Sequence, residues 1–278
     1  MKNIFTKVSL ALATVLALSS CGTPTSSTTS ETQKDDSVLR VGMECNYAPF
    51  NWTTSKDGKF TQKINDVDYC DGYDVVMAEK LAEKLGKEVQ IVKLDWSNLT
   101  LSLNNGKIDA IIAGMTNTPE RAKEVDFTDP YYESEEVILV KADSKYASAT
   151  SLSDFKNAKV QGQMNTMYDT IIDQINGVNH MPAAESFPAA IQALQSGATD
   201  GVTAELPVAK GVVEANPNLT MVRFEKGKGF DADTTVSIAV KKGNTELLNQ
   251  LQNALSSIDT DTRNKMMEDA VSRQPAVK

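Results

Sequence analysis

Arg121 ends the stretch of this chain with the clearest capacity for chemistry, Ala113 to Arg121, whose sequence is Ala-Gly-Met-Thr-Asn-Thr-Pro-Glu-Arg. The pattern predicts the end of a buried strand, a turn of small residues, and a helix with Thr118 as N-cap and Pro119 at the first helical position. Free backbone N–H groups at a helix start favour an anion, and an arginine in the first turn adds a planar guanidinium that binds a carboxylate through two N–H groups. The stretch therefore predicts a carboxylate clamp. The alternative is a solvated arginine on a helix surface.

Strands alternate with helices along the chain. In the first half the pattern predicts strands at Val38 to Met43, Val89 to Lys93 and Ile108 to Ala113, with helices at Asp74 to Leu85, Trp96 to Asn104 and from Pro119 onward. Asp74 is expected to cap the first of these helices, which has one apolar face and ends before Gly86. Such alternation predicts right-handed crossovers and an open, mostly parallel sheet, with binding at the carboxyl ends of its strands.

The second half shows the same alternation. Its expected strands are Glu136 to Lys141, Lys159 to Gln163, Gly201 to Ala204, Leu219 to Phe224 and Val236 to Val240. Its expected helices are Leu152 to Phe155, Thr166 to Ile175, Pro188 to Gln195, Pro207 to Glu214, Glu246 to Leu255 and Asp261 to Ala270. The chain is thus expected to form two α/β lobes, which suits a folded part of roughly 240 residues.

The N-terminal residues 1–20 are predicted to be a secretory signal peptide, because a lysine-containing start precedes a short apolar stretch, Val8 to Leu18. The ending Leu18-Ser19-Ser20-Cys21 matches a bacterial lipobox. In that interpretation Cys21 becomes a lipidated N-terminus that tethers the protein to the cell membrane. The alternative is ordinary secretory cleavage with Cys21 incidental. Residues 21–37 are rich in Ser and Thr and are predicted to be a flexible tether.

The composition bounds the partners. The formal net charge of −9 argues against nucleic acid and against a basic membrane-binding face. The single histidine, His180, and the lack of a ligand-spaced cluster predict no metal and no cofactor. If Cys21 is lipidated, Cys45 and Cys70 remain in an oxidising compartment, where they flank the segment between the first strand and the first helix. A disulfide and two free thiols both remain open.

Five motifs in series resemble those of the solute-binding protein family 3, the extracytoplasmic amino-acid receptors of ABC importers. They are Tyr47-Ala48-Pro49-Phe50, Gly72-Tyr73-Asp74, Gly106-Lys107-Ile108-Asp109, the Thr116 to Arg121 turn with Asp126 to Tyr132, and Asp200 to Glu205. The resemblance runs from about Val38 to Pro275. It implies two Rossmann-like lobes with mostly parallel sheets and a two-strand hinge, the type 2 periplasmic binding protein fold. Lobe 1 would comprise 38–133 and 239–278 and lobe 2 134–238, with hinge crossings near 133–135 and 234–238.

The resemblance also implies a site for a free amino acid, which presents a carboxylate, an ammonium group and a side chain. Arg121, with the backbone and hydroxyl of Thr116, would hold the carboxylate from lobe 1. Asn165 and Thr166, at a helix start, would add donors from lobe 2. Many relatives have Ser-Gly-Thr in that turn, whereas this chain has Met164-Asn165-Thr166. The alternative for Asn165 is a plain N-cap.

The ammonium group would be accepted by Glu205 together with backbone groups at Gly114 and Met115, unless Glu205 is simply solvated. The side-chain slot would be formed by Glu44, Tyr47, Phe50 and Trp52. Aromatic faces can hold an aliphatic stem or a cation, and Glu44 could neutralise a cationic end. Lysine, arginine or ornithine are therefore the leading ligands.

Other interpretations of the slot and of the function remain. Glu44 could instead face solvent beside Cys45, and the slot would then take a neutral polar side chain or cystine. Asp95 and Trp96 fit better as structural residues under the cleft. The resemblance implies a monomer, not an enzyme, that reaches the membrane only through its lipid anchor and delivers its ligand to permease subunits. A sensor and a dehydratase-type enzyme of the same fold are the rivals, although no nucleophile with an evident base is present.

Overall fold

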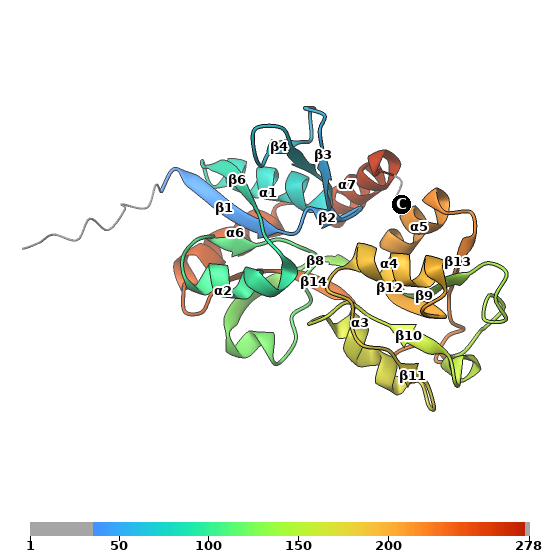
Figure 1. Cartoon of the computed structure of the whole chain (residues 1–278). Helices are drawn as coiled ribbons and strands as arrows, with labels where there is room; N and C mark the ends of the chain where they lie inside the picture. Colours follow the sequence, from blue (N-terminus) through green and yellow to red (C-terminus); the bar gives the residue numbers. More distant parts are fainter. Residues whose placement is uncertain (1–35, 276–278) are drawn as a thin grey trace, which may run out of the picture. The chain divides into compact units, whose positions relative to one another are not determined.

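The computed structural model describes residues 36–275. The expected signal peptide, Cys21 and all but the last two residues of the expected tether lie outside the described residues. Between residues 36 and 275, no helix combines the length and apolar character that a membrane span requires. The described residues form two α/β lobes and one small antiparallel sheet (Figure 1).

Lobe 1 is built on a five-stranded sheet in the order β6-β1-β7-β14-β8. Its strands are β1 (Val38–Met43), β6 (Glu88–Lys93), β7 (Ala110–Ile111), β8 (Val125–Glu133) and β14 (Thr235–Lys241). β1 pairs in parallel with β6 and β7, whereas β14 runs antiparallel to β7 and β8. All strands except β14 therefore run in one direction, and the mostly parallel sheet expected from the sequence is confirmed.

The helices of lobe 1 follow the predicted positions closely, apart from their ends. They are α1 (Tyr73–Lys84), η1 (Trp96–Asn98), α2 (Leu99–Asn104), α6 (Thr245–Ser256) and α7 (Thr260–Arg273). The apolar face of α1, with Val75, Ala78 and Leu81, is buried as its spacing predicts. Asp74 is not the cap of α1, which is a correction: Gly72 is the N-cap, and Asp74 lies inside the fold.

A four-stranded antiparallel sheet, β2-β3-β5-β4, lies between β1 and α1 along the chain and was not predicted. Its strands are β2 (Asn46–Tyr47), β3 (Asn51–Thr54), β4 (Gln62–Lys63) and β5 (Tyr69–Asp71). Cys45 and Cys70 form a disulfide that joins the turn after β1 to β5. Of the two alternatives for these cysteines, the structure contains the bridge.

Lobe 2 has a second five-stranded sheet in the order β11-β10-β12-β9-β13. The strands are β9 (Glu136–Lys141), β10 (Lys159–Gln161), β11 (Asn179–His180), β12 (Gly201–Glu205) and β13 (Leu219–Val222). Only β9 opposes the others. The helices are η3 (Leu152–Phe155), α3 (Met167–Thr170), η4 (Ile171–Gln174), α4 (Phe187–Ser196) and α5 (Leu206–Ala215).

The chain passes between the sheets twice. It leaves the first sheet with β8 at Glu133, enters the second with β9 at Glu136, and returns through β14. Thr235 of β14 already pairs with Glu133 of β8. Thr235 falls within the range 234–238 expected for the second crossing, and the division of the chain into lobes stays a prediction.

Candidate functional site

A cavity of about 340 Å³, counting the space that opens to solvent, lies between the two lobes. The space inside it that a water-sized sphere can occupy is about 20 Å³, room for about one water molecule. Its walls come from both lobes: Glu44, Tyr47, Trp96, Ala113, Gly114, Thr116 and Arg121 from lobe 1, and Gln163, Thr166, Met167 and Tyr168 from lobe 2. The carboxyl ends of β1, β7 and β10 lead into this wall, as the sheet topology predicts.

The segment that carries Arg121 differs from the prediction. The helix expected after Pro119 is only a single 3₁₀ turn, η2 (Arg121–Lys123), and Thr118 is not its N-cap. Thr118 Oγ1 still accepts the backbone N–H of Arg121 at 3.3 Å. Because β8 begins at Val125, only one turn fits between the two elements. A helix N-terminus therefore contributes no anion site here, and that part of the clamp prediction is wrong.

The guanidinium of Arg121 does face the cavity. Its Nη1 donates to the carbonyl of Thr116 at 2.8 Å and its Nη2 to the carbonyl of Asn165 at 2.9 Å. Burial lowers the pKa of Arg121 to about 10, so the group stays charged at neutral pH. Among residues 36–275 it forms no ion pair with a carboxylate. A half-buried cation whose hydrogen bonds go only to carbonyl groups is a good receptor for an anion.

Asn165 does not line the cavity but contacts residues of lobe 1. Its carbonyl accepts from Arg121 and, at 3.1 Å, from Trp96 Nε1, while its side chain donates to Ser97 Oγ at 3.2 Å. Its φ of 60° places it in the left-handed region. The sequence predicted that Asn165 donates a hydrogen bond to the ligand. Its side-chain amide instead points to lobe 1. Asn165 is therefore a contact between the lobes.

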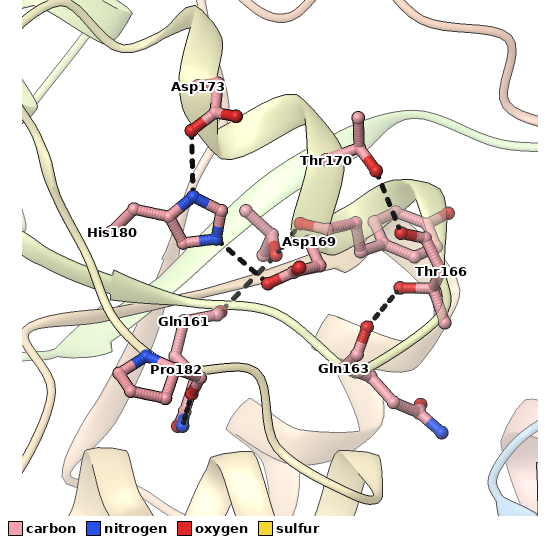
Figure 2. Close-up of polar contacts among 10 residues, drawn as sticks. Gln161, Gln163, Thr166, Asp169, Thr170, Asp173, His180 and Pro182 are labelled. Atoms are coloured by element: carbon pink, nitrogen blue, oxygen red, sulfur yellow. Dashed lines mark hydrogen bonds and ion pairs between the residues drawn. The ribbon is translucent and has the colours of Figure 1, made fainter. Parts of the chain in front are cut away.

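Thr166 is the N-cap of α3 and lines the cavity beside Gln163. Figure 2 shows its Oγ1 donating to the Gln163 carbonyl at 2.7 Å. The same view shows His180 between two carboxylates, with Nε2 at 2.9 Å from Asp169 and Nδ1 at 2.8 Å from Asp173. Burial disfavours the charged imidazole, but the hydrogen bonds to the two aspartates outweigh burial and raise the pKa of His180. His180 thereby ties α3 and η4 to β11.

Glu205 ends β12 and is fully buried. Its Oε1 accepts from the Tyr47 hydroxyl at 2.7 Å, a bond between the lobes. Its Oε2 is buried and has no hydrogen-bond partner among the described residues. Burial raises the pKa of Glu205 to about 8, although the bond from Tyr47 opposes this. A buried carboxylate with an unsatisfied oxygen is costly unless a cation or donor reaches it.

Glu44 lies on the cavity wall and is 6% exposed. Both of its carboxylate oxygens lie 3.3 Å from Gln163 Nε2, which belongs to lobe 2. Burial raises the pKa of Glu44 to about 7, while hydrogen bonds from Gln163, Asn46 and Trp96 oppose the rise. Glu44 therefore does not face solvent, unlike in the alternative interpretation. Its carboxylate lies on the cavity wall, where it could neutralise a cation.

Of the three aromatic residues expected at the slot, Tyr47 lines the cavity, whereas Phe50 and Trp52 do not. Phe50 is fully buried behind Tyr47, with ring centroids 5.7 Å apart, and Trp52 packs against Arg273. Neither residue lines the cavity, nor does Met115, whose carbonyl accepts from Ser237. Trp96, to which the sequence assigned a structural role, lines the cavity. The centre of its ring lies 5.2 Å from the Arg121 guanidinium.

Gln163, Met167 and Tyr168 were also missed. A signal for Trp96 did exist, because it follows the carboxyl end of β6, where binding residues of such sheets gather. Gln163 likewise follows β10. Between residues 36 and 275, no group of three or more His, Cys, Asp or Glu side chains could hold a metal ion.

Two α/β lobes with a cavity between them, a guanidinium without a carboxylate partner among residues 36–275, and buried carboxylates define a two-lobed small-molecule binding protein of the type 2 periplasmic binding protein fold. The chain belongs to the bacterial extracellular solute-binding proteins, family 3, whose model matches residues 39–270.

Similar proteins extend over most of the chain. The ABC transporter glutamine-binding protein GlnH of Bacillus subtilis is 28% identical over 275 residues, 95% of this chain and 94% of that protein. A solved ancestral arginine-binding protein bound to arginine is 33% identical, with a TM-score of 0.70, and the match covers 84% of this chain and 97% of that one. The binding protein AbpA of Streptococcus pneumoniae bound to L-arginine is 28% identical, with a TM-score of 0.73 and coverage of 85% and 95%.

Proposed function

We propose that this protein is an extracytoplasmic receptor that binds a free α-amino acid with a basic side chain and delivers it to an ABC importer. The observation that carries the proposal is a cation on the cavity wall, Arg121, together with a buried acid, Glu205, that is hydrogen-bonded to the wall residue Tyr47. Arg121 has no carboxylate partner among the described residues, and the buried Glu205 has an oxygen without a partner. An α-amino acid supplies both missing charges on one carbon atom.

Each part of the ligand has a receptor group. The α-carboxylate would bind the Arg121 guanidinium, assisted by Thr116 and Thr166 at the wall. The α-ammonium would bind Glu205, once the Tyr47 hydroxyl releases the carboxylate that it now holds. Glu44 would pair with the charged end of the side chain, whose stem would lie between the rings of Tyr47 and Trp96. The arginine-bound relatives support a basic ligand.

Lobe closure follows from the same groups. In this structure the lobes touch through Tyr47 and Glu205, through Gln163 and Glu44, and through Arg121 with the carbonyl of Asn165. The first two contacts involve carboxylates that the ligand would bind. Without a ligand, Tyr47 and Gln163 donate hydrogen bonds to these carboxylates instead. A ligand that binds both lobes better than these contacts do would shift the population towards a closed, loaded form, which the permease would recognise.

Attachment to the membrane belongs to the same proposal. The sequence Leu18-Ser19-Ser20-Cys21 supports cleavage after the signal peptide and lipidation of Cys21. The mature monomer would then be held at the cell membrane by its lipid alone. Replacing Cys21 with Ser should release the protein into the medium of the expressing bacterium; retention in the membrane fraction would contradict the anchor.

The ligand is tested by a thermal-shift screen of the twenty amino acids, ornithine and cystine, because a ligand that binds only the native state raises its apparent stability. Lysine, arginine or ornithine should give the largest rise. Mass spectrometry of the recovered ligand should show it unchanged, as expected for a receptor; conversion would favour an enzyme.

Arg121→Ala tests the clamp by calorimetry. Loss of a charge-assisted pair to a buried carboxylate costs about 2–5 kcal/mol, so affinity should fall at least about thirtyfold. Lys123→Ala, on the same 3₁₀ turn, is the matched control and should bind normally. Wild-type affinity in Arg121→Ala would remove the basis of the proposal.

A further inference from the structure

Asp74 is a fully buried carboxylate that does not line the cavity. It belongs to α1 and accepts two short hydrogen bonds. Asn51 Nδ2 donates to its Oδ2 at 2.8 Å, and the Tyr131 hydroxyl donates to its Oδ1 at 2.8 Å. Asp74, Asn51 and Tyr131, all almost completely buried, are here called the Asp74 network.

Each arm of the Asp74 network ends at a backbone N–H beside the cavity. The N–H of Cys45, next to Glu44, donates to Asn51 Oδ1 at 2.7 Å. The N–H of Gly114 donates to the Tyr131 hydroxyl at 2.9 Å. Glu44 and Gly114 both line the cavity. One carboxylate therefore connects, through two side chains, to two separate turns of the cavity wall.

Both turns have unusual backbones that need support. Cys45 has a φ of 52° and Gly114 a φ of 60°, in the left-handed region. For the non-glycine Cys45 this conformation is costly and persists only where its surroundings enforce it. The disulfide holds the Cys45 side chain, while the Asp74 network holds its N–H group.

The direction of the hydrogen bonds restricts the central residue. Both arms begin at a donor that cannot change, a backbone N–H group. Asn51 must therefore accept from Cys45 with its oxygen and donate with its nitrogen, and Tyr131 must accept from Gly114 and donate with its hydroxyl proton. Both arms consequently arrive at Asp74 as donors. Only a side chain with two acceptors, an ionised carboxylate, satisfies both.

We propose that Asp74 is a positioning residue of the ligand site, because its ionised carboxylate fixes through Asn51 and Tyr131 the two turns that present Glu44 and Gly114 to the ligand. The proposal rests on the amino-acid-binding function proposed above. It assigns Asp74 no contact with the ligand. Its role is to set the position of a side-chain acid that follows β1 and of a backbone turn that follows β7.

The test changes the hydrogen-bond donors and acceptors at position 74 and keeps the shape of the side chain. Asp74→Asn places an amide donor against the Asn51 amide or, if Asn51 turns over, places the Asn51 donor against the Cys45 N–H. In either case a buried donor is left unsatisfied. The affinity of the intact protein for L-arginine, measured by calorimetry at pH 8, should fall about tenfold or more. Glu79→Gln, on the same helix but bonded to Gln62, is the matched control and should bind normally.

The exchange variant Asn51→Asp/Asp74→Asn separates positioning from charge or general stability. The carboxylate introduced at position 51 would accept from both the Cys45 N–H and the amide introduced at position 74. The oxygen of that amide would accept from Tyr131, so the donors at both ends of the network are satisfied again. The exchange should restore affinity to within a few-fold of wild type, even if Asp74→Asn alone does not fold. Wild-type affinity in Asp74→Asn would overturn the proposal. So would an exchange variant that does not fold, or that binds no better than Asp74→Asn.

A second measurement does not depend on the ligand. Hydrogen exchange of the Cys45 and Gly114 amides should accelerate at least tenfold in Asp74→Asn relative to Glu79→Gln, and recover in the exchange variant. If wild-type protein bound no amino acid, the proposed function would fail, while the exchange rates would still decide whether the network holds the turns. Unchanged rates in folded Asp74→Asn would overturn the network.

Discussion

Glu44 is the residue that decides between a cationic and a neutral ligand. It is nearly buried, its neighbour is the amide of Gln163, and burial raises its pKa to about 7. A ligand cation beside it would favour the carboxylate form. Binding of arginine or lysine should therefore release a proton from the fraction of Glu44 that is protonated in the ligand-free protein.

Glu44→Gln should weaken the binding of L-arginine by about 1.5–3 kcal/mol, roughly ten- to a hundredfold, because a hydrogen-bonded charge pair is lost. Any affinity for L-glutamine should change by only a few-fold, since no charge faces Glu44 in that complex. Calorimetry with both ligands checks this. Equal losses for both ligands would mean that Glu44 shapes the wall without recognising charge.

The pH dependence supplies an independent check on Glu44. The affinity of wild-type protein for L-arginine should rise between pH 6 and pH 8, as Glu44 ionises. Glu205, with a pKa raised to about 8, adds a rise of its own that applies to any amino acid. Glu44→Gln should therefore make the rise shallower without abolishing it. An unchanged slope would place the titrating group elsewhere.

At the scale of elements, Gly72 explains why α1 can begin where it does. Its φ of 137° is rarely adopted by other residues, and a Cβ there would lie 2.2 Å from the carbonyl oxygen of Phe50. The obstruction is backbone of the adjoining loop, so it cannot simply rotate away. The close approach also allows the N–H of Asp74 to donate to the same carbonyl at 2.8 Å.

Gly72→Ala should therefore destabilise the protein by about 3 kcal/mol or more, through the combined cost of strain and overlap. Gly86→Ala is the control: it also has a positive φ, but a Cβ would meet nothing within 4 Å, so its cost should be about 1–2 kcal/mol. Denaturant unfolding of both variants gives the comparison. Similar losses would show that conformation alone, rather than contact with Phe50, requires glycine.

The sequence predicted the elements that are long enough to show a periodic pattern of apolar residues. The helices α1, α4 and α5 and the strands β1, β6 and β9 carry apolar residues at helical or buried-strand spacing and lie close to their expected bounds. The strands β2 and β4 have two residues each, too few for any period to show. Their pairing depends on contacts between distant residues, which a local pattern does not contain.

The errors in the site have the same physical origin. Thr118-Pro119 is a good helix start locally, yet β8 and its pairing with β14 take over the chain after one turn. Asp74 was assigned to the cap because acids favour helix starts, whereas burial against Asn51 and Tyr131 decides its place. Arg121, Thr116 and Glu44, which follow strand ends of one sheet, lie at one cavity wall, and Tyr47 of β2 lies there with them.

At the scale of the whole molecule, the protein carries several buried acids that receive no cation from the described chain. Burial raises the pKa of Glu44 and Asp74 to about 7 and that of Glu205 to about 8. For Asp74 the hydrogen bonds from Tyr131 and Asn51 oppose the rise. The negative charge of Asp74 also raises the pKa of Glu205. Ionisation of these acids is therefore unfavourable in the ligand-free fold, and a ligand cation beside Glu44 or Glu205 would offset that cost.

The sign of the resulting pH dependence follows from linkage. Each of these three acids has a higher pKa in the native state than in the unfolded chain, so the native state holds more protons between about pH 4.5 and pH 8. The free energy of unfolding of the ligand-free protein should therefore fall as the pH rises through this window. A loss of about 1 kcal/mol per group corresponds to roughly 2–4 °C in Tm for a protein of this size.

Thermal unfolding at pH 5, 6.5 and 8, with and without saturating L-arginine, checks this expectation. The ligand-free Tm should be lowest at pH 8, and the increase in Tm on adding ligand should be largest there, because the ligand cations stabilise the ionised forms of Glu44 and Glu205. Glu44→Gln should flatten the ligand-free curve by its own share, since it removes one titrating group. A ligand-free Tm that rises from pH 5 to pH 8 would show that these acids are already compensated in the native state. The cost of ionising these acids would then contribute nothing to the free energy of ligand binding.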